Sequence, residues 1–101
     1  MARTRITKRN IASVAKQIEQ AMNEAVSIFT GYVVYTKSSE RGASIRLREA
    51  QGMAITSVVI RRLYTHIMRF DDIYDNIVIS FDTGTDDDGF TFPTFSVLIY
   101  A

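Results

Sequence analysis

The spacing of apolar residues switches between a helical period and an extended period, and this switching is the strongest constraint on the fold. From residue 11 to residue 29, apolar side chains recur at steps of three and four, which is typical of one buried helix face. Residues 32–37 are then rich in β-branched and aromatic side chains, and residues 44–48 alternate strictly between apolar and polar. With turn residues at 38–42 between them, these two segments predict a β-hairpin.

A second helical stripe follows in residues 53–70, although part of that segment is ambiguous. Residues 55–60 are rich in β-branched side chains and locally favour a strand. The longer pattern favours a helix, because four apolar residues repeat at steps of four, four and three. They are Val59, Leu63, Ile67 and Phe70. We therefore predict a helix, with residues 53–60 open to either assignment.

The last third of the chain has the pattern of a second hairpin. Residues 71–76 are polar and predict a connection, while the alternation of residues 77–82 predicts a strand. Residues 83–89 contain two glycines and predict a turn before a fourth strand at 90–100. Pro93 has no N–H to donate to a neighbouring strand, so we expect it at a sheet edge or at a bulge.

The resulting order α-β-β-α-β-β predicts an α+β fold. Two hairpins and two helices give a four-stranded, mostly antiparallel sheet with both helices on one face. The order is a cyclic permutation of the ferredoxin-like βαββαβ unit. A chain of 101 residues forms one domain, which we place at residues 7–101, after a flexible basic arm at residues 1–6. The other face of the sheet is expected to be open and available for binding.

Charge is distributed unevenly along the chain, although the net charge is only +1. All 12 Lys and Arg lie in residues 1–70 with four glutamates, so this part has a net charge of +8. Residues 71–101 contain seven aspartates and no Lys or Arg. Such asymmetry indicates an anionic partner for the basic part, or head-to-tail pairing of molecules. The alternative is that the two parts fold together and neutralise each other on one surface.

The alternation of the second strand places basic residues on the expected open face. Arg46 and Arg48 alternate with apolar residues that would face the helices, so both arginines point the other way. If the first strand has the matching phase, Tyr35 and Lys37 lie beside them. Aromatic rings next to guanidinium groups suit single-stranded nucleic acid, because bases stack on the rings and phosphates pair with the cations. The alternative is a solvated face whose Arg stems cover apolar surface.

Two further basic clusters lie outside the strands. Four cations lie at or before the start of the first helix, where the helix dipole disfavours them, and they resemble a phosphate-contacting arm. They are Arg3, Arg5, Lys8 and Arg9. Three arginines on the outer face of the second helix suit phosphates or an acidic protein. They are Arg61, Arg62 and Arg69. The alternatives are a solubilising tail and a solvated helix face.

The residue types that an enzyme or a metal site needs are sparse. The chain has no cysteine and a single histidine, His66, which lacks a neighbouring His or Cys to share a metal ion. The aspartates at 82–88 do not match a calcium loop and instead suit a hairpin turn. No set of base, nucleophile and charge stabiliser is evident. We therefore expect no enzymatic activity, no cofactor and no metal site.

We expect a small, non-enzymatic binding protein that engages nucleic acid, or a nucleic-acid–protein complex, through its basic arm and Arg-bearing surface. The lack of cysteine fits a reducing compartment such as the cytoplasm, and the longest apolar run is too short for a membrane helix. Two alternatives stay open. One is an inhibitor or adaptor, of the compact kind that phages and plasmids encode, that binds a host protein. The other is a structural subunit that forms oligomers when its acidic hairpin docks on a neighbour's basic helix.

Overall fold

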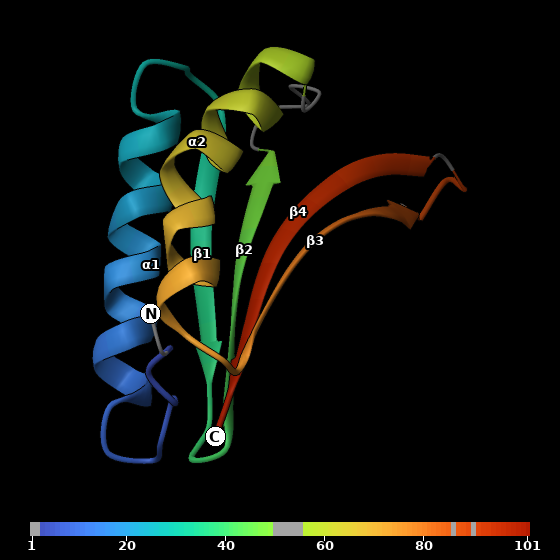
Figure 1. Ribbon diagram of the computed structural model, residues 1–101. Coiled ribbons are helices and arrows are strands. Elements are labelled where there is room, and N and C mark those ends of the chain that lie inside the picture. The colour runs from blue at the N-terminus through green and yellow to red at the C-terminus, as the bar shows by residue number, and fades with distance from the viewer. Residues whose placement is uncertain (1–2, 50–55, 86, 90) are drawn as a thin grey trace.

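The elements occur along the chain in the order that the apolar spacing predicts. A computed structural model describes residues 3–49, 56–85, 87–89 and 91–101. The elements, which are labelled in Figure 1, are α1 (Ile11–Val26), β1 (Tyr32–Ser38), β2 (Gly42–Glu49), α2 (Ser57–Ile73), β3 (Ile77–Thr85) and β4 (Thr91–Tyr100).

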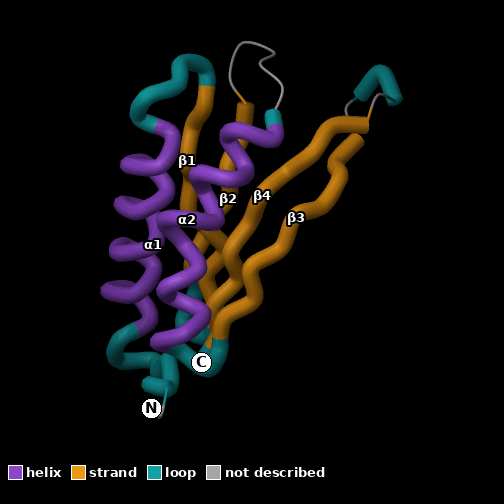
Figure 2. Tube along the Cα trace, turned by 45° about the horizontal axis from the view of Figure 1, so that its top comes forward, coloured by secondary structure: helices purple, strands orange, loops and turns teal. Residues whose placement is uncertain are grey.

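The four strands form one antiparallel sheet, and both helices pack on the same face of it (Figure 2). The strand order is β1-β2-β4-β3, so each hairpin occupies half of the sheet and β2 meets β4 at its centre. A ferredoxin-like unit whose first strand is moved to the end of the chain has this same order of elements. The predicted α+β fold is therefore confirmed.

The core lies between the helices and the covered face of the sheet. Ile18 and Met22 of α1 belong to the same buried cluster as Ile45 of β2 and Phe95 and Val97 of β4. The two helices and the two central strands thus share one core. Burying a large apolar side chain stabilises a fold by roughly 1.5–3 kcal/mol, so this cluster holds the two layers together.

In the structure, the described part of the segment that is ambiguous in the sequence belongs to the second helix, α2. Its buried side chains are the four that the spacing singles out, Val59, Leu63, Ile67 and Phe70. The helix prediction is confirmed for residues 57–70, and the strand alternative is wrong for residues 57–60. Residues 53–55 lie outside the described part of the chain.

The end of α2 differs from the prediction. Asp71 and Asp72 continue the helix to Ile73, where a polar connection is predicted. Both carboxylates remain accessible from the helix surface, since Asp72 is exposed and Asp71 is half-buried. The last turn closes when the Tyr74 N–H donates to the Phe70 carbonyl at 2.9 Å. The two polar side chains therefore do not end this helix, because they lie on its solvent-accessible side.

The β3–β4 hairpin extends further than β2 does. The described pairing of β2 with β4 ends at Leu47 and Phe95, whereas β3 and β4 pair without interruption as far as Thr85 and Thr91. Pro93 lies beyond the end of the β2 pairing, where β4 has β3 as its described neighbour. The edge prediction for Pro93 is confirmed, and the bulge alternative is wrong because the register is continuous. Figure 1 shows this part of the hairpin curving away from the helices.

The segment that precedes α1 is attached to the end of α2. The Thr4 N–H donates to the Ile73 carbonyl at 2.7 Å, and the Asp75 N–H donates to the Thr4 carbonyl at 3.1 Å. The Ile6 side chain is fully buried, and the Asn76 side-chain amide donates to the Ile6 carbonyl at 3.5 Å. The described part of the predicted arm thus has backbone contacts with the domain and contributes one side chain to its core.

Candidate functional site

The face of the sheet opposite the helices is open, and the phase of β1 and β2 determines which side chains lie on it. On β1, Val34 is half-buried on the helix side, while Tyr35 and Lys37 are exposed. On β2, Ile45 is fully buried and Arg46 is exposed. Successive strand residues point to opposite faces, so Tyr35, Lys37 and Arg46 share the open face, as the alternation predicts.

Tyr35 and Arg46 are directly opposite each other in the β1–β2 ladder. Opposed residues on one face of an antiparallel pair have Cβ atoms about 4.5–5.5 Å apart, so the two side chains leave the sheet next to each other. Tyr35 is 41% exposed. Within the described residues no ion pair involves Arg46, so its guanidinium group is accessible to an anion from solvent.

Two more charged residues belong to this face by backbone register. Arg48 lies two residues after Arg46 on β2 and pairs with Val33 of β1. Asp82 lies two residues after Ser80 on β3, at the far edge of the sheet. The side chains of Arg48 and Asp82 lie outside the described part of the structure. On the backbone, β4 lies between the strands that contain Arg48 and Asp82.

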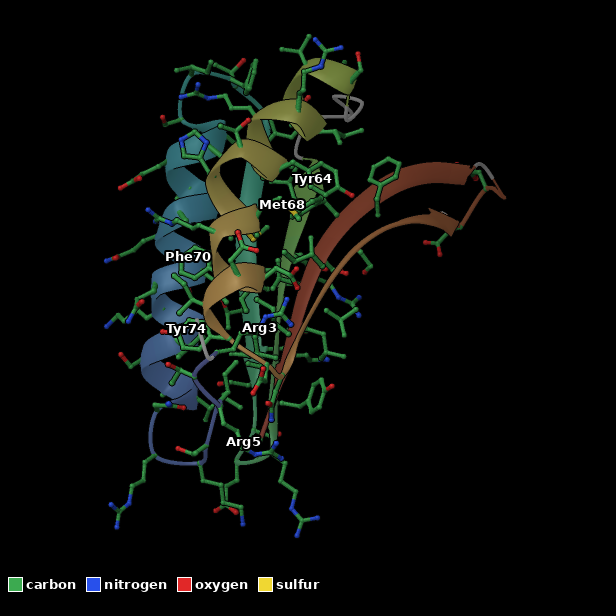
Figure 3. The ribbon with its side chains drawn as sticks, in the orientation of Figure 1. Arg3, Arg5, Tyr64, Met68, Phe70 and Tyr74 are labelled. Atoms are coloured by element: carbon green, nitrogen blue, oxygen red, sulfur yellow. The ribbon has the colours of Figure 1, made fainter. Side chains whose placement is uncertain are left out.

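The cations of the N-terminal cluster lie at one end of the molecule. All four are exposed: Arg3, Arg5, Lys8 and Arg9. Figure 3 shows Arg5 at the end where the β1–β2 turn and the C-terminus also lie. The turn and the C-terminus are joined there, because the Ala101 N–H donates to the Arg41 carbonyl at 2.9 Å. Lys37 also lies near this turn, at the end of β1.

The arginines of α2 lie on the other layer of the molecule. Arg61 is exposed, and the Arg69 guanidinium lies over the Phe70 ring, 4.9 Å from its centroid. Arg62 is half-buried, and its Nε donates to the Ala25 carbonyl in α1 at 2.7 Å. Because α2 packs on the covered face of the sheet (Figure 2), these side chains are separated from Tyr35 and Arg46. The arginines of α2 and the basic residues of the strands therefore lie on two different surfaces.

The sequence analysis missed an apolar area on the same open face. Val78 of β3 and Leu98 and Tyr100 of β4 are each 46% exposed. A signal for this area exists in β4, where these residues alternate with apolar residues of the core, so that the strand is apolar on both faces. The open face thus has Tyr35 and the cations on β1 and β2, and an apolar area on β3 and β4, called the apolar half below, at the end where Val78 pairs with Leu98.

Metal ligation and membrane spanning find no support in the described residues. No group of three or more His, Cys, Asp and Glu among them is close enough to share a metal ion. The His66 Nδ1 lies 2.9 Å from the Arg62 carbonyl, one turn earlier in α2. Neither described helix is long and apolar enough to cross a membrane.

Comparison with protein-family models, with curated proteins and with solved structures found no match, so the function of this chain is inferred from its own geometry.

Proposed function

We propose that this protein is a non-enzymatic module that binds single-stranded nucleic acid on the open face of its sheet. The main support is the exposed, directly opposed pair of Tyr35 and Arg46, with Lys37 on the same strand face. A Tyr ring provides a surface on which a base can stack, and the neighbouring cations pair with phosphates. Every base has a π-face, so binding of this kind tolerates any sequence.

The N-terminal cations add affinity at the turn end of the sheet. All four of these residues are exposed, and Figure 3 shows Arg5 at the turn end, where β1 ends just after Lys37. Each phosphate that a cation neutralises releases counterions, which makes affinity fall with salt by about 0.7 log units per log unit of salt for a single strand. The arm therefore contributes salt-dependent affinity, whereas stacking on Tyr35 favours unpaired bases over a duplex.

Fluorescence anisotropy with a labelled oligo(dT), between about 50 and 200 mM salt, tests this proposal. The Tyr35→Ala variant is expected to weaken binding by roughly 1–3 kcal/mol, because one stacking surface is lost. The Arg46→Ala variant is expected to weaken binding. It is also expected to reduce the slope of log affinity against log salt concentration by the contribution of one phosphate contact. A duplex of the same sequence is expected to bind more weakly than the single strand.

Arg61→Ala is the matched control, because Arg61 is also exposed but lies on α2, on the other layer. Its affinity for oligo(dT) is expected to equal that of the wild type. Absence of binding at about 50 mM salt, or equal losses in the Arg61→Ala and Arg46→Ala variants, would overturn the proposal.

The apolar half of the open face favours a second candidate function, which is binding of a protein. Contiguous exposed apolar surface is typical of protein interaction sites, and Val78 lies in this half, 46% exposed. A protein inhibitor or adaptor is expected to capture one defined partner from a native lysate after nuclease treatment. Loss of that partner in the Val78→Ser variant, with oligo(dT) binding unchanged, would support this candidate, whereas capture that requires intact nucleic acid would exclude it.

A further inference from the structure

A hollow lies at the turn end of the open face, and we infer that it binds the phosphorylated end of a single strand. This inference rests on the proposed function and names the part of the nucleic acid that the site prefers. The hollow has a volume of about 400 Å³ and is formed mainly by the β1–β2 hairpin. Among its lining residues are Lys37, Ser38, Ser39, Ser44 and Leu98.

The hollow is continuous with the proposed stacking surface. Lys37 follows Tyr35 by two residues on the same face of β1, and Ser44 is its partner across the ladder. Residues two apart on an antiparallel strand are separated by about 6.8 Å. A nucleotide stacked on Tyr35 therefore places the next one in the chain over the hollow.

The lining combines one apolar side chain with polar groups that suit a phosphate. Leu98 pairs with Ser44 in the β2–β4 ladder and is 46% exposed, which gives apolar surface for a base or sugar. The Lys37 side chain is exposed beside it. Ser44 is half-buried, and its hydroxyl makes no hydrogen bond within the part of the chain that the structure describes. An ammonium group and a hydroxyl are thus both accessible to phosphate oxygens.

The position and charge of the hollow favour the end of a strand over its middle. Ser38 and Ser39 close it at the β1–β2 turn, where the Ser39 hydroxyl donates to the Gly42 carbonyl at 3.3 Å. A terminal phosphate monoester has a charge of about −1.5 to −2 near neutral pH, against −1 for an internal diester. Glu40 and Arg41 of the turn are both exposed and opposite in sign, so Lys37 gives the lining of the hollow its positive charge.

The experiment compares short oligo(dT) strands that end in a 5′-phosphate, in a 3′-phosphate or in hydroxyl groups only. At pH 8, one phosphorylated form is expected to bind about tenfold more tightly than the hydroxyl form, as one charge-assisted contact predicts. The gain is expected to disappear in the Lys37→Gln variant and to decrease in the Ser44→Ala variant. It is also expected to shrink at about pH 5.5, because the second pKa of a phosphate monoester is about 6.

Lys16→Gln is the matched control, because Lys16 is an exposed lysine on α1, and it is expected to keep the full gain. Equal binding of the three strands would overturn this inference and leave the proposed function standing. A gain that survives in the Lys37→Gln variant would also overturn it. Failure of all three strands to bind would overturn the proposed function itself. Circular dichroism of each variant confirms that the fold is retained, since all three substituted side chains lie outside the core.

Discussion

Arg61 and Arg62 are neighbours in the sequence, yet the structure gives their side chains different surroundings. Arg61 is exposed on α2, whereas the Arg62 Nε donates to the Ala25 carbonyl at 2.7 Å. That carbonyl lies in the last turn of α1, where it has no N–H partner within the helix. The charge pattern groups the two arginines together, because the sequence does not show which backbone acceptor a long side chain reaches. Arg62 thus links the two helices.

Replacement of these neighbours separates a structural arginine from a solvated one. Arg62→Ala is expected to lower the free energy of unfolding by about 1.5–3 kcal/mol, because a hydrogen bond from a charged donor is lost. Arg61→Ala is expected to change it by less than about 0.5 kcal/mol. Urea denaturation measures both values. A larger loss in Arg61→Ala than in Arg62→Ala would show that the link between the helices does not contribute to stability.

At the scale of elements, periodic segments are predictable and their attachments are not. The stripe that includes Leu63 and Ile67 correctly predicts α2, since burial of one helix face imposes that spacing. The attachment of the segment before α1 is not evident from its basic composition. Ile6 is the one buried residue among the described residues of this segment, and its neighbours in the sequence are exposed and polar. A single apolar side chain has no period, so only the fold shows what it packs against.

The attachment of this segment is tested by Ile6. Ile6→Ala is expected to lower the free energy of unfolding by about 2–5 kcal/mol, because a fully buried side chain leaves a cavity. The paired change Arg3→Ala and Arg5→Ala is expected to leave that free energy nearly unchanged, because both side chains are exposed. Thermal or urea unfolding measures both variants. If Ile6→Ala is as stable as the wild type, the segment does not contribute to the core.

For the whole molecule, the acidic residues of the last third of the chain lie in two places, at the turn of the β3–β4 hairpin and beside the N-terminal segment. Asp87 and Asp88, both exposed, lie at the turn of the projecting β3–β4 hairpin, away from the N-terminal end (Figure 1). The aspartates near the N-terminal segment, at positions 72 and 75, are exposed and form no ion pair with its cations within the described residues. Mutual neutralisation on one surface therefore stays the alternative prediction at this end of the molecule, because the Asp75 N–H donates to the carbonyl of Thr4, which lies between Arg3 and Arg5 in the sequence.

How the basic clusters are arranged depends on packing, and the sequence predicts it only in part. Strand alternation correctly places Tyr35, Lys37 and Arg46 on one face, because the period of two is a property of the backbone. The position of α2 relative to that face depends on how the two layers pack, which local patterns do not contain. The sequence of β4 is apolar on both faces, but only the strand order shows that β3 lies beside it and completes the apolar half of the face.

The central claim is that the open face of the sheet binds single strands. It is tested most directly by amide chemical shifts of the isotopically labelled protein during titration with unlabelled oligo(dT). The account predicts shift changes at Tyr35, Lys37 and Arg46, which share that face, and smaller changes at exposed α2 residues such as Arg61 and Arg69. Changes confined to α2, or no change at any of these amides, would contradict it.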